Sequence, residues 1–229
     1  MSQLLENLQH IQAQIADAAV QAGRPADSVR LIAVSKTKPA TMVQAAYDAG
    51  QRDFGENRVQ ELQEKQPALP ADIRWHLIGS LQRNKVKYIA DYIYLIHSVD
   101  SERLLAEINK RAAQADRTIN CLLQLNISEE DAKSGLDESK AEAILSNIEA
   151  YPHIHIKGLM GMAAFTDEEA VVLAQFARLQ EASEQFAAQF DHPRISMEEL
   201  SMGMSGDFGL AIRKGATMVR IGSAVFGQR

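Results

Sequence analysis

The sequence is poor in cysteine, since Cys121 is alone in 229 residues. A single cysteine cannot build a disulfide framework, and its place in the apolar run Ile119–Leu123 favours a buried, reduced thiol over a nucleophile. The sequence also shows no spacing of histidine, cysteine and carboxylate residues that is typical of a metal site. These absences argue against a disulfide-stabilised secreted scaffold and against a metal-dependent enzyme.

The sequence also lacks long apolar runs, basic clusters and a targeting segment. No apolar stretch approaches the length of a membrane span, and residues 1–20 lack the basic start and apolar block of a signal peptide. The net charge of -6 and the pI near 5.5 argue against a nucleic-acid partner held by phosphate neutralisation. We therefore expect a cytoplasmic protein with no nucleic-acid or membrane partner, whose charge still allows a small anion to be held locally.

The sequence does contain enough apolar residues for a large core. Hydrophobic residues make up 46% of the chain and charged residues 24%. At this length the chain suits one large core better than two ordinary domains. We expect one domain spanning residues 1–229.

An apolar run from Val29 to Val34 stops at Lys36. The run is too dense in Val, Ile and Leu for a solvent-facing helix, and Pro39 disfavours helix before it, which predicts a buried parallel strand. Lys36 then lies at the carboxyl end of that strand, where ligands collect in α/β proteins. The alternative is an ordinary solvated lysine at a strand exit.

The rest of the chain alternates between strand and helix patterns. Strands are predicted at 29–36, 53–56, 75–79, 92–99, 118–126, 154–162, 199–202 and 218–222. Helices are predicted at 2–22, 41–50, 57–65, 81–89, 101–115, 137–149, 167–190 and 207–214, with Asp100 as the cap of the helix that follows it. Eight alternating strands favour an α/β fold of the closed (β/α)8 TIM-barrel type, preceded by an extra amino-terminal helix.

Two glycine-containing loops follow the last two predicted strands. They comprise residues 201–207 and 220–223, and Ser201, Ser205 and Ser223 add hydroxyl groups to them. In barrels these two positions commonly bind phosphate, because glycines let backbone amides approach the oxygens closely. The alternative is a pair of tight turns that need glycine for backbone reasons alone.

Arg220 lies within the eighth predicted strand, which neighbours the Lys36 strand in a closed barrel. A buried arginine cannot lose its charge, so it needs either a structural ion pair or a ligand. An amine near a phosphate site suggests a Schiff base with a phosphorylated aldehyde or sugar, because shielding from water lowers the pKa of a lysine.

Six motifs distributed over nearly the whole chain carry a family resemblance. They are Ala33–Lys38 (AVSKTK), Phe54–Asn57 (FGEN), Trp75–Gln82 (WHLIGSLQ), Gly158–Met162 (GLMGM), Leu200–Ser205 (LSMGMS) and Arg220–Ser223 (RIGS). Together they resemble the pyridoxal 5′-phosphate (PLP) homeostasis proteins, which are stand-alone relatives of the barrel domain of alanine racemase. The match of several long motifs in the same order makes the resemblance specific.

The resemblance implies a role for individual residues. Lys36 would hold PLP as a reversible Schiff base, and Arg220 would face the pyridine nitrogen. The phosphate would be held by Ser201, Gly222 and Ser223, with Asn57 and Met202 as lesser contacts. Position 223 is often threonine in this family, and serine keeps the hydroxyl group.

The function that the resemblance implies is intracellular PLP homeostasis, with delivery of PLP to PLP-dependent apoenzymes as part of the hypothesis. Alanine racemases carry a further β domain with a tyrosine base and much of the dimer contact, whereas this chain ends seven residues after Gly222. We therefore expect a monomer without strong catalysis, the more so because an arginine at the pyridine nitrogen makes PLP a poorer electron sink. A weak amino-acid racemase, and a phosphosugar lyase or isomerase, remain as alternatives.

Three further residues have two interpretations each. His76 lies inside a predicted strand and is either a hydrogen-bonded core histidine or a general base. Lys133 follows the fifth strand and is either a solvated lysine or a second acceptor for the cofactor. Glu56 either caps the following helix or takes part in chemistry.

Overall fold

A computed structural model describes residues 2–128 and 135–227 of the chain. Its parallel strands close into a barrel in the order of the sequence, from β1 to β8 and back to β1. The strands are β1 Arg30–Val34, β2 Asp53–Glu56, β3 Arg74–Leu77, β4 Leu95–Val99, β5 Ile119–Gln124, β6 Ile154–Met160, β7 Ile195–Ser201 and β8 Met218–Ile221. The predicted TIM barrel is thereby confirmed.

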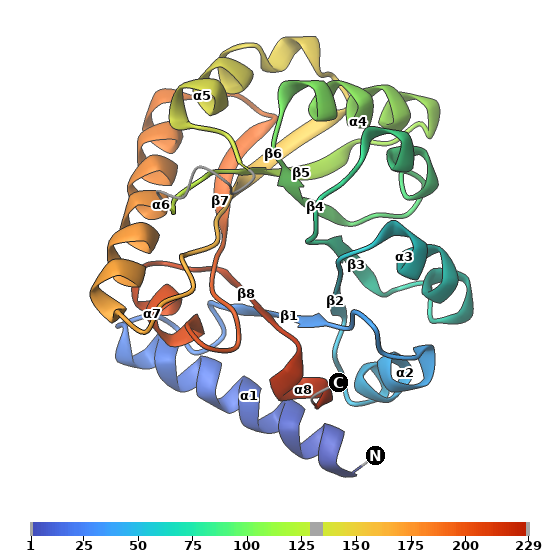
Figure 1. Ribbon diagram of the computed structural model, residues 1–229. Coiled ribbons are helices and arrows are strands. Elements are labelled where there is room, and N and C mark those ends of the chain that lie inside the picture. The colour runs from blue at the N-terminus through green and yellow to red at the C-terminus, as the bar shows by residue number, and fades with distance from the viewer. Residues whose placement is uncertain (1, 129–134, 228–229) are drawn as a thin grey trace.

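Helices surround the barrel on the outside (Figure 1). They are α1 Ser2–Gln21, α2 Ala40–Asp48, α3 Val59–Lys65, α4 Glu102–Gln114, α5 Glu138–Ser146, α6 Glu169–Gln189, α7 Phe208–Arg213 and α8 Ser223–Phe226, with 3-10 turns η1 Gln66–Ala68, η2 Arg83–Tyr88 and η3 Ile148–Ala150. This outer layer explains why the strands read as nearly continuous apolar runs, since both of their faces are covered. None of the helices among the described residues is long and apolar enough to cross a membrane.

The extra amino-terminal helix α1 lies against α7 and α8 on the outside of the barrel (Figure 1). Its apolar positions recur at helical spacing, and the side chains of Leu8, Ile11, Ile15 and Ala19 are all buried. This is the helix predicted at 2–22. α1 therefore covers the part of the barrel wall that the short helices α7 and α8 leave incomplete.

The structure corrects three local predictions. The helix predicted at 81–89 is instead the 3-10 turn η2 over Arg83–Tyr88, and β7 begins at Ile195 rather than at residue 199. The cap of α4 is Ser101, whose Oγ accepts a hydrogen bond from the backbone N–H of Leu104, so the assignment to Asp100 was wrong. Both residues are good caps, and only the backbone path decides which side chain reaches the amide.

A buried ionic network fixes the loop that carries Lys36. Lys65 Nζ donates to Glu56 Oε1 at 2.6 Å, to Glu61 Oε2 at 3.0 Å and to the carbonyl of Ser35 at 2.9 Å. Ser35 Oγ also donates to Glu56, and the backbone N–H of Thr37 donates to Glu61 at 2.6 Å. The residues on both sides of Lys36 are thus tied to α3, which holds Thr37 at a φ of 64°.

The Lys65 ammonium group pairs with the carboxylates of both Glu56 and Glu61, and Glu56 is the more buried of the two. Burial raises the pKa of Glu56 to about 6, against the opposing hydrogen bonds from Lys65 and Ser35. Its second oxygen, Oε2, is buried without a hydrogen-bond partner among the described residues. The folded protein therefore holds a proton on Glu56 to a higher pH than the unfolded chain does, whose carboxyl has the ordinary pKa of 4.5.

This difference in pKa predicts a pH-dependent contribution of Glu56 to stability. The contribution is fully present below the unfolded pKa and is lost as the pH rises through the folded pKa, because the folded state binds more protons in that window. It amounts to roughly 2 kcal/mol, taken from the shift in pKa. Urea unfolding of the wild type and Glu56→Gln between about pH 4 and about pH 8 measures it.

The stability advantage of the wild type over Glu56→Gln should shrink as the pH rises through that window. Glu64→Gln is the matched control, because Glu64 is exposed on α3, the helix that carries Lys65, and its difference from the wild type should not follow this curve. An advantage that grows with pH would show that the carboxylate form of Glu56 is the one the fold prefers.

Candidate functional site

A cavity of about 320 Å³ opens at the carboxyl ends of the strands and contains most of the predicted site residues. Lys36, Asn57, Arg220, Gly222 and Ser223 all line it. They come from the ends of β1, β2 and β8, which the closed barrel brings together although they lie far apart in the sequence. A larger cavity of about 630 Å³, between α1, α6 and α7, holds none of the predicted residues.

Lys36 lies two residues beyond the end of β1 and is partly exposed at this cavity. β1 pairs with β8, so that Ile32 lies opposite Arg220 in the sheet register. At the end of β8, Gly222 passes so close to β1 that a Cβ there would lie 3.0 Å from the carbonyl oxygen of Val34. Because Gly222 has no side chain, the loop after β8 can lie against the end of β1, and both border the same cavity.

Arg220 is almost fully buried at the base of the cavity. Its Nη1 donates to the carbonyl and to Oγ of Ser201 at 2.8 and 2.6 Å, and its Nη2 donates to the carbonyl of Gly161 at 3.1 Å. These bonds use three of the five N–H groups of a guanidinium. In the part of the chain that the structure describes, Arg220 forms no ion pair with a carboxylate.

Burial lowers the pKa of Arg220 to about 10, with partial compensation from the charge of Asp207. The guanidinium therefore remains charged near neutral pH. A buried charge held only by neutral oxygens is costly unless a further electron-rich atom approaches it. The two N–H groups that remain are available for a ligand in the cavity.

Hydroxyl groups lie at the outer rim of the same cavity. Ser223 and Ser205 are both exposed and line it. Ser223 follows Gly222, and Ser205 precedes Gly206, in the two predicted phosphate loops. In one of these loops, Gly203 has a φ of 91°, a conformation that favours glycine. Hydroxyl donors of this kind suit the oxygens of a phosphate group.

Two of the predicted residues lie beneath the cavity and do not line it. Ser201 and Met202 are fully buried, and the hydroxyl of Ser201 contacts Nη1 of Arg220 and Nδ1 of His97. In this arrangement the Ser201 hydroxyl faces the barrel interior. The position of Ser201 in its sequence motif does not show in which direction its hydroxyl points. A direct phosphate contact from Ser201 stays a prediction, and it competes with a role of this hydroxyl in holding Arg220.

The three residues with two interpretations have different outcomes. His76 is fully buried and hydrogen-bonded to Asp53 and His97, which confirms the interpretation as a core histidine. Glu56 forms the ion pair with Lys65, and the cap position of α3 is Arg58, so the interpretation of Glu56 as a helix cap, one of the two alternatives, is wrong. Lys133 lies outside the described residues.

Sequence reasoning missed several residues around the site. Ser205, a possible hydroxyl donor outside the predicted site, lies at the rim of the cavity, and Met162 and Met204 also line it. His97 was overlooked, and the one available signal was a polar residue inside the apolar strand β4. Its contacts with His76 and Ser201 come from other strands, so no local pattern could reveal them.

The residues of this cavity fit a phosphorylated aldehyde such as PLP. Lys36 offers a primary amine, Arg220 offers two free N–H donors for an electron-rich atom, and the serine hydroxyls lie where an anion can reach solvent. The described residues include no group of three or more His, Cys, Asp or Glu side chains that could hold a metal ion. The polar groups that the cavity offers to a ligand include an amine, a guanidinium and serine hydroxyls.

A family model and two curated proteins match this chain over nearly its whole length. Residues 6–229 match the family "Alanine racemase, N-terminal domain". The pyridoxal phosphate homeostasis protein of Pasteurella multocida is 40% identical over 98% of this chain and 97% of its own length. The protein of the same name from Pseudomonas aeruginosa is 41% identical over 100% of this chain and 97% of its own length.

Solved structures agree with these matches. PipY of Synechococcus elongatus, solved with PLP bound, is 37% identical, with a TM-score of 0.85 over 98% of this chain and 100% of its own. Alanine racemase of Bartonella henselae, at 16% identity and a TM-score of 0.68, shares the fold over 60% of its length. Because the relatives match at about two-fifths identity from end to end, the chain belongs to the pyridoxal phosphate homeostasis protein family, within the larger group that shares the alanine racemase barrel.

Proposed function

We propose that this protein binds PLP reversibly through Lys36 and takes part in controlling the intracellular supply of this cofactor. The observation that carries the proposal is the placement of the Lys36 amine and the buried, carboxylate-free Arg220 on one cavity. Support comes from PipY, a relative with PLP bound, and from relatives named for PLP homeostasis. Delivery of PLP to apoenzymes is part of this proposal.

Different residues of the cavity contact different parts of PLP in this proposal. When bound, PLP supplies an aldehyde that condenses reversibly with primary amines, so that another amine can displace the lysine. We assign the amine to Lys36, the pyridine nitrogen to Arg220, and the phosphate to Gly222 and Ser223. Asn57 lines the same cavity as a lesser contact, while Met202 lies under it.

The same residues argue against strong catalysis. A charged arginine beside a pyridine nitrogen donates a hydrogen bond to it and disfavours its protonation. An unprotonated ring is a weak electron sink, so the protein should do little to stabilise carbanions of amino acids. The relatives are named as homeostasis proteins, which agrees with a carrier and gives the racemase alternative less support.

Replacing Lys36 should separate covalent from noncovalent binding. Lys36→Ala removes the only amine that we assign to the PLP aldehyde, so borohydride reduction should no longer fix the cofactor to the protein. Intact-mass analysis measures this directly, and the visible absorption band of the wild type should disappear in the variant. The band also separates the PLP proposal from a phosphosugar enzyme, which would have none.

Lys38→Ala is the matched control for this experiment. Lys38 lies on the same loop and lines the same cavity, and its Nζ donates to the carbonyl of Gly227 at 3.0 Å. Its replacement should leave the covalent attachment in place. Cofactor still fixed to Lys36→Ala after reduction would identify another lysine as the attachment point.

Ser223 should recognise the phosphate rather than the ring. A hydrogen bond to a charged group contributes about 1.5–3 kcal/mol, so Ser223→Ala should weaken PLP binding roughly tenfold to a hundredfold. Binding of pyridoxal, which has no phosphate, should hardly change. Ser223→Thr keeps the hydroxyl and should bind PLP nearly as well as the wild type. Equal losses for PLP and pyridoxal in Ser223→Ala would mean that Ser223 shapes the site generally.

A carrier and a racemase differ in what they do to alanine. When the PLP-loaded protein is incubated with L- or D-alanine in deuterated water, we expect negligible interconversion of the two enantiomers and little exchange of the Cα proton. An added PLP-dependent apoenzyme should gain activity in the same period. Racemisation at many turnovers per second without any transfer would establish the enzyme and refute the carrier.

A further inference from the structure

A continuous chain of buried side chains runs through the barrel interior and ends on Arg220. Asp53 Oδ1 lies 3.0 Å from Nε2 of His76, and Nδ1 of His76 lies 2.9 Å from Nε2 of His97. Nδ1 of His97 lies 2.8 Å from Oγ of Ser201, which accepts from Nη1 of Arg220 at 2.6 Å. The five residues are each at most 4% exposed. We call them the polar column.

The polar column joins strands that are distant in the barrel. Its members come from β2, β3 and β4 on one side and from β7 and β8 on the other. In the closed strand order β4 and β7 are not neighbours, so the contact between His97 and Ser201 crosses the interior. The column therefore connects opposite walls of the barrel through side chains alone.

The two ends of the polar column fix the direction of every hydrogen bond within it. Arginine only donates and an ionised carboxylate only accepts. Ser201 must then donate to His97, His97 to His76, and His76 to Asp53, if each contact is to have one proton. Both imidazoles are consequently neutral and carry their proton on Nε2.

The electrostatics of the polar column agree with this assignment. Burial is the main cause that lowers the pKa of His76 and of His97, so both rings are neutral near pH 7. Burial alone would raise the pKa of Asp53, but hydrogen bonds from His76 and Arg74 outweigh it and leave the pKa below its ordinary value. Asp53 is therefore ionised and serves as the terminal acceptor.

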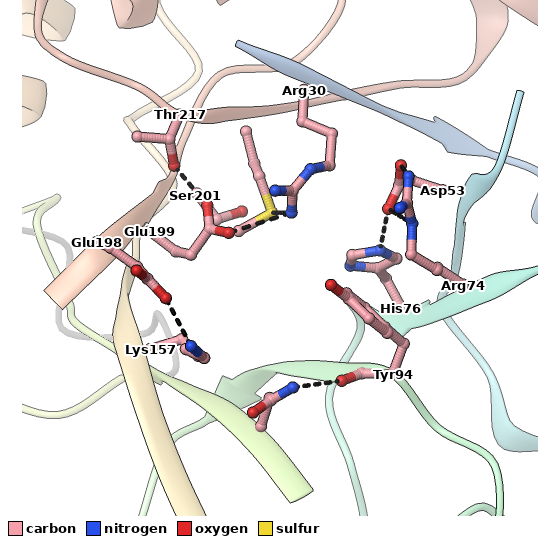
Figure 2. A network of polar contacts seen from close by, with 12 residues as sticks. Arg30, Asp53, Arg74, His76, Tyr94, Lys157, Glu198, Glu199, Ser201 and Thr217 are labelled. Atoms are coloured by element: carbon pink, nitrogen blue, oxygen red, sulfur yellow. Dashed lines mark hydrogen bonds and ion pairs between the residues drawn. The ribbon is translucent and has the colours of Figure 1, made fainter. Parts of the chain in front are cut away.

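The far end of the polar column lies in a second polar network, at the amino ends of the strands. Figure 2 shows Asp53 bonded to both Arg74 and His76, across from the pairs of Glu199 with Arg30 and Thr217. The Arg74 side chain is 43% exposed there. Asp53 is thus anchored by a residue that reaches solvent at the end of the barrel opposite the cofactor cavity.

The polar column has a direct consequence for Arg220. Because the Ser201 proton points to His97, the lone pairs of this hydroxyl face the guanidinium, which also donates to the carbonyls of Ser201 and Gly161. These contacts leave Arg220 one orientation. We propose that Asp53, His76 and His97 are positioning residues that, through Ser201, aim the two free N–H groups of Arg220 at the pyridine nitrogen of PLP. This inference rests on the proposed function.

The first test needs no cofactor. Long-range ¹H–¹⁵N correlation spectra of the wild-type protein report which nitrogen of each histidine carries the proton. We expect His76 and His97 to be neutral Nε2–H tautomers, and the Nδ1 signal of His97 to shift in Ser201→Ala as it loses its donor. A proton on Nδ1 of either ring would break the donor sequence and overturn the inference, whether or not the protein binds PLP.

The second test compares three ligands in Ser201→Ala: PLP, pyridoxal, and the PLP analogue with carbon in place of the ring nitrogen. Ser201→Ala removes an acceptor of the charged Arg220 guanidinium and so loosens the aim of its remaining N–H groups. We therefore expect about ten- to a hundredfold weaker binding of PLP and of pyridoxal. The analogue should bind to the variant and the wild type equally, because it offers no nitrogen to Arg220. His97→Phe should reproduce this pattern if urea unfolding shows that it folds.

Ser98→Ala is the matched control, because it removes a buried hydroxyl that donates to the carbonyl of Gly79 outside the polar column. It should leave the affinities for the three ligands unchanged. Weaker binding of PLP and the analogue, but not of pyridoxal, in Ser201→Ala would make Ser201 a phosphate ligand and refute the positioning role. Equal losses for the three ligands, or no loss at all, would refute it too. A wild type that binds none of them would instead refute the proposed function.

Discussion

The site depends on one constraint, which is the burial of a permanently charged guanidinium inside a barrel. Arg220 cannot shed its charge, and within the described residues it forms no ion pair with a carboxylate. The carbonyls of Ser201 and Gly161 and the hydroxyl of Ser201 provide the compensation. Because these acceptors belong to β7 and to the loop after β6, the charge is held only when the barrel is closed.

Two buried networks serve the two functional groups in different ways. The Lys36 loop is tied to α3 by ions, through Lys65, Glu56 and Glu61, whereas Arg220 is held by neutral acceptors. The ionic network lies beside the lysine and leaves the Lys36 side chain itself partly exposed at the cavity. The proposed function uses this combination, since the Lys36 amine must stay accessible to exchange while Arg220, the proposed ring contact, stays fixed.

Much of the architecture was predictable because it repeats. The alternation of apolar runs and amphipathic segments identified the barrel, and the glycine loops after the last two strands identified the end where Lys36, Gly222 and Ser223 meet. Local boundaries were less predictable. Asp100 and Ser101 are adjacent and chemically similar caps, and the segment predicted as a helix at 81–89 is a 3-10 turn over Arg83–Tyr88.

The sequence by itself determined the barrel and the chemistry available at its mouth, because periodicity and strand-end position are local properties of the chain. Only the tertiary structure decided which way Ser201 faces, that Glu56 pairs with Lys65, and that His76 and His97 form one column with Asp53. The reason is physical. A buried polar side chain must find its hydrogen-bond partner wherever the closed barrel provides one, and here the partners lie up to 104 residues away along the chain.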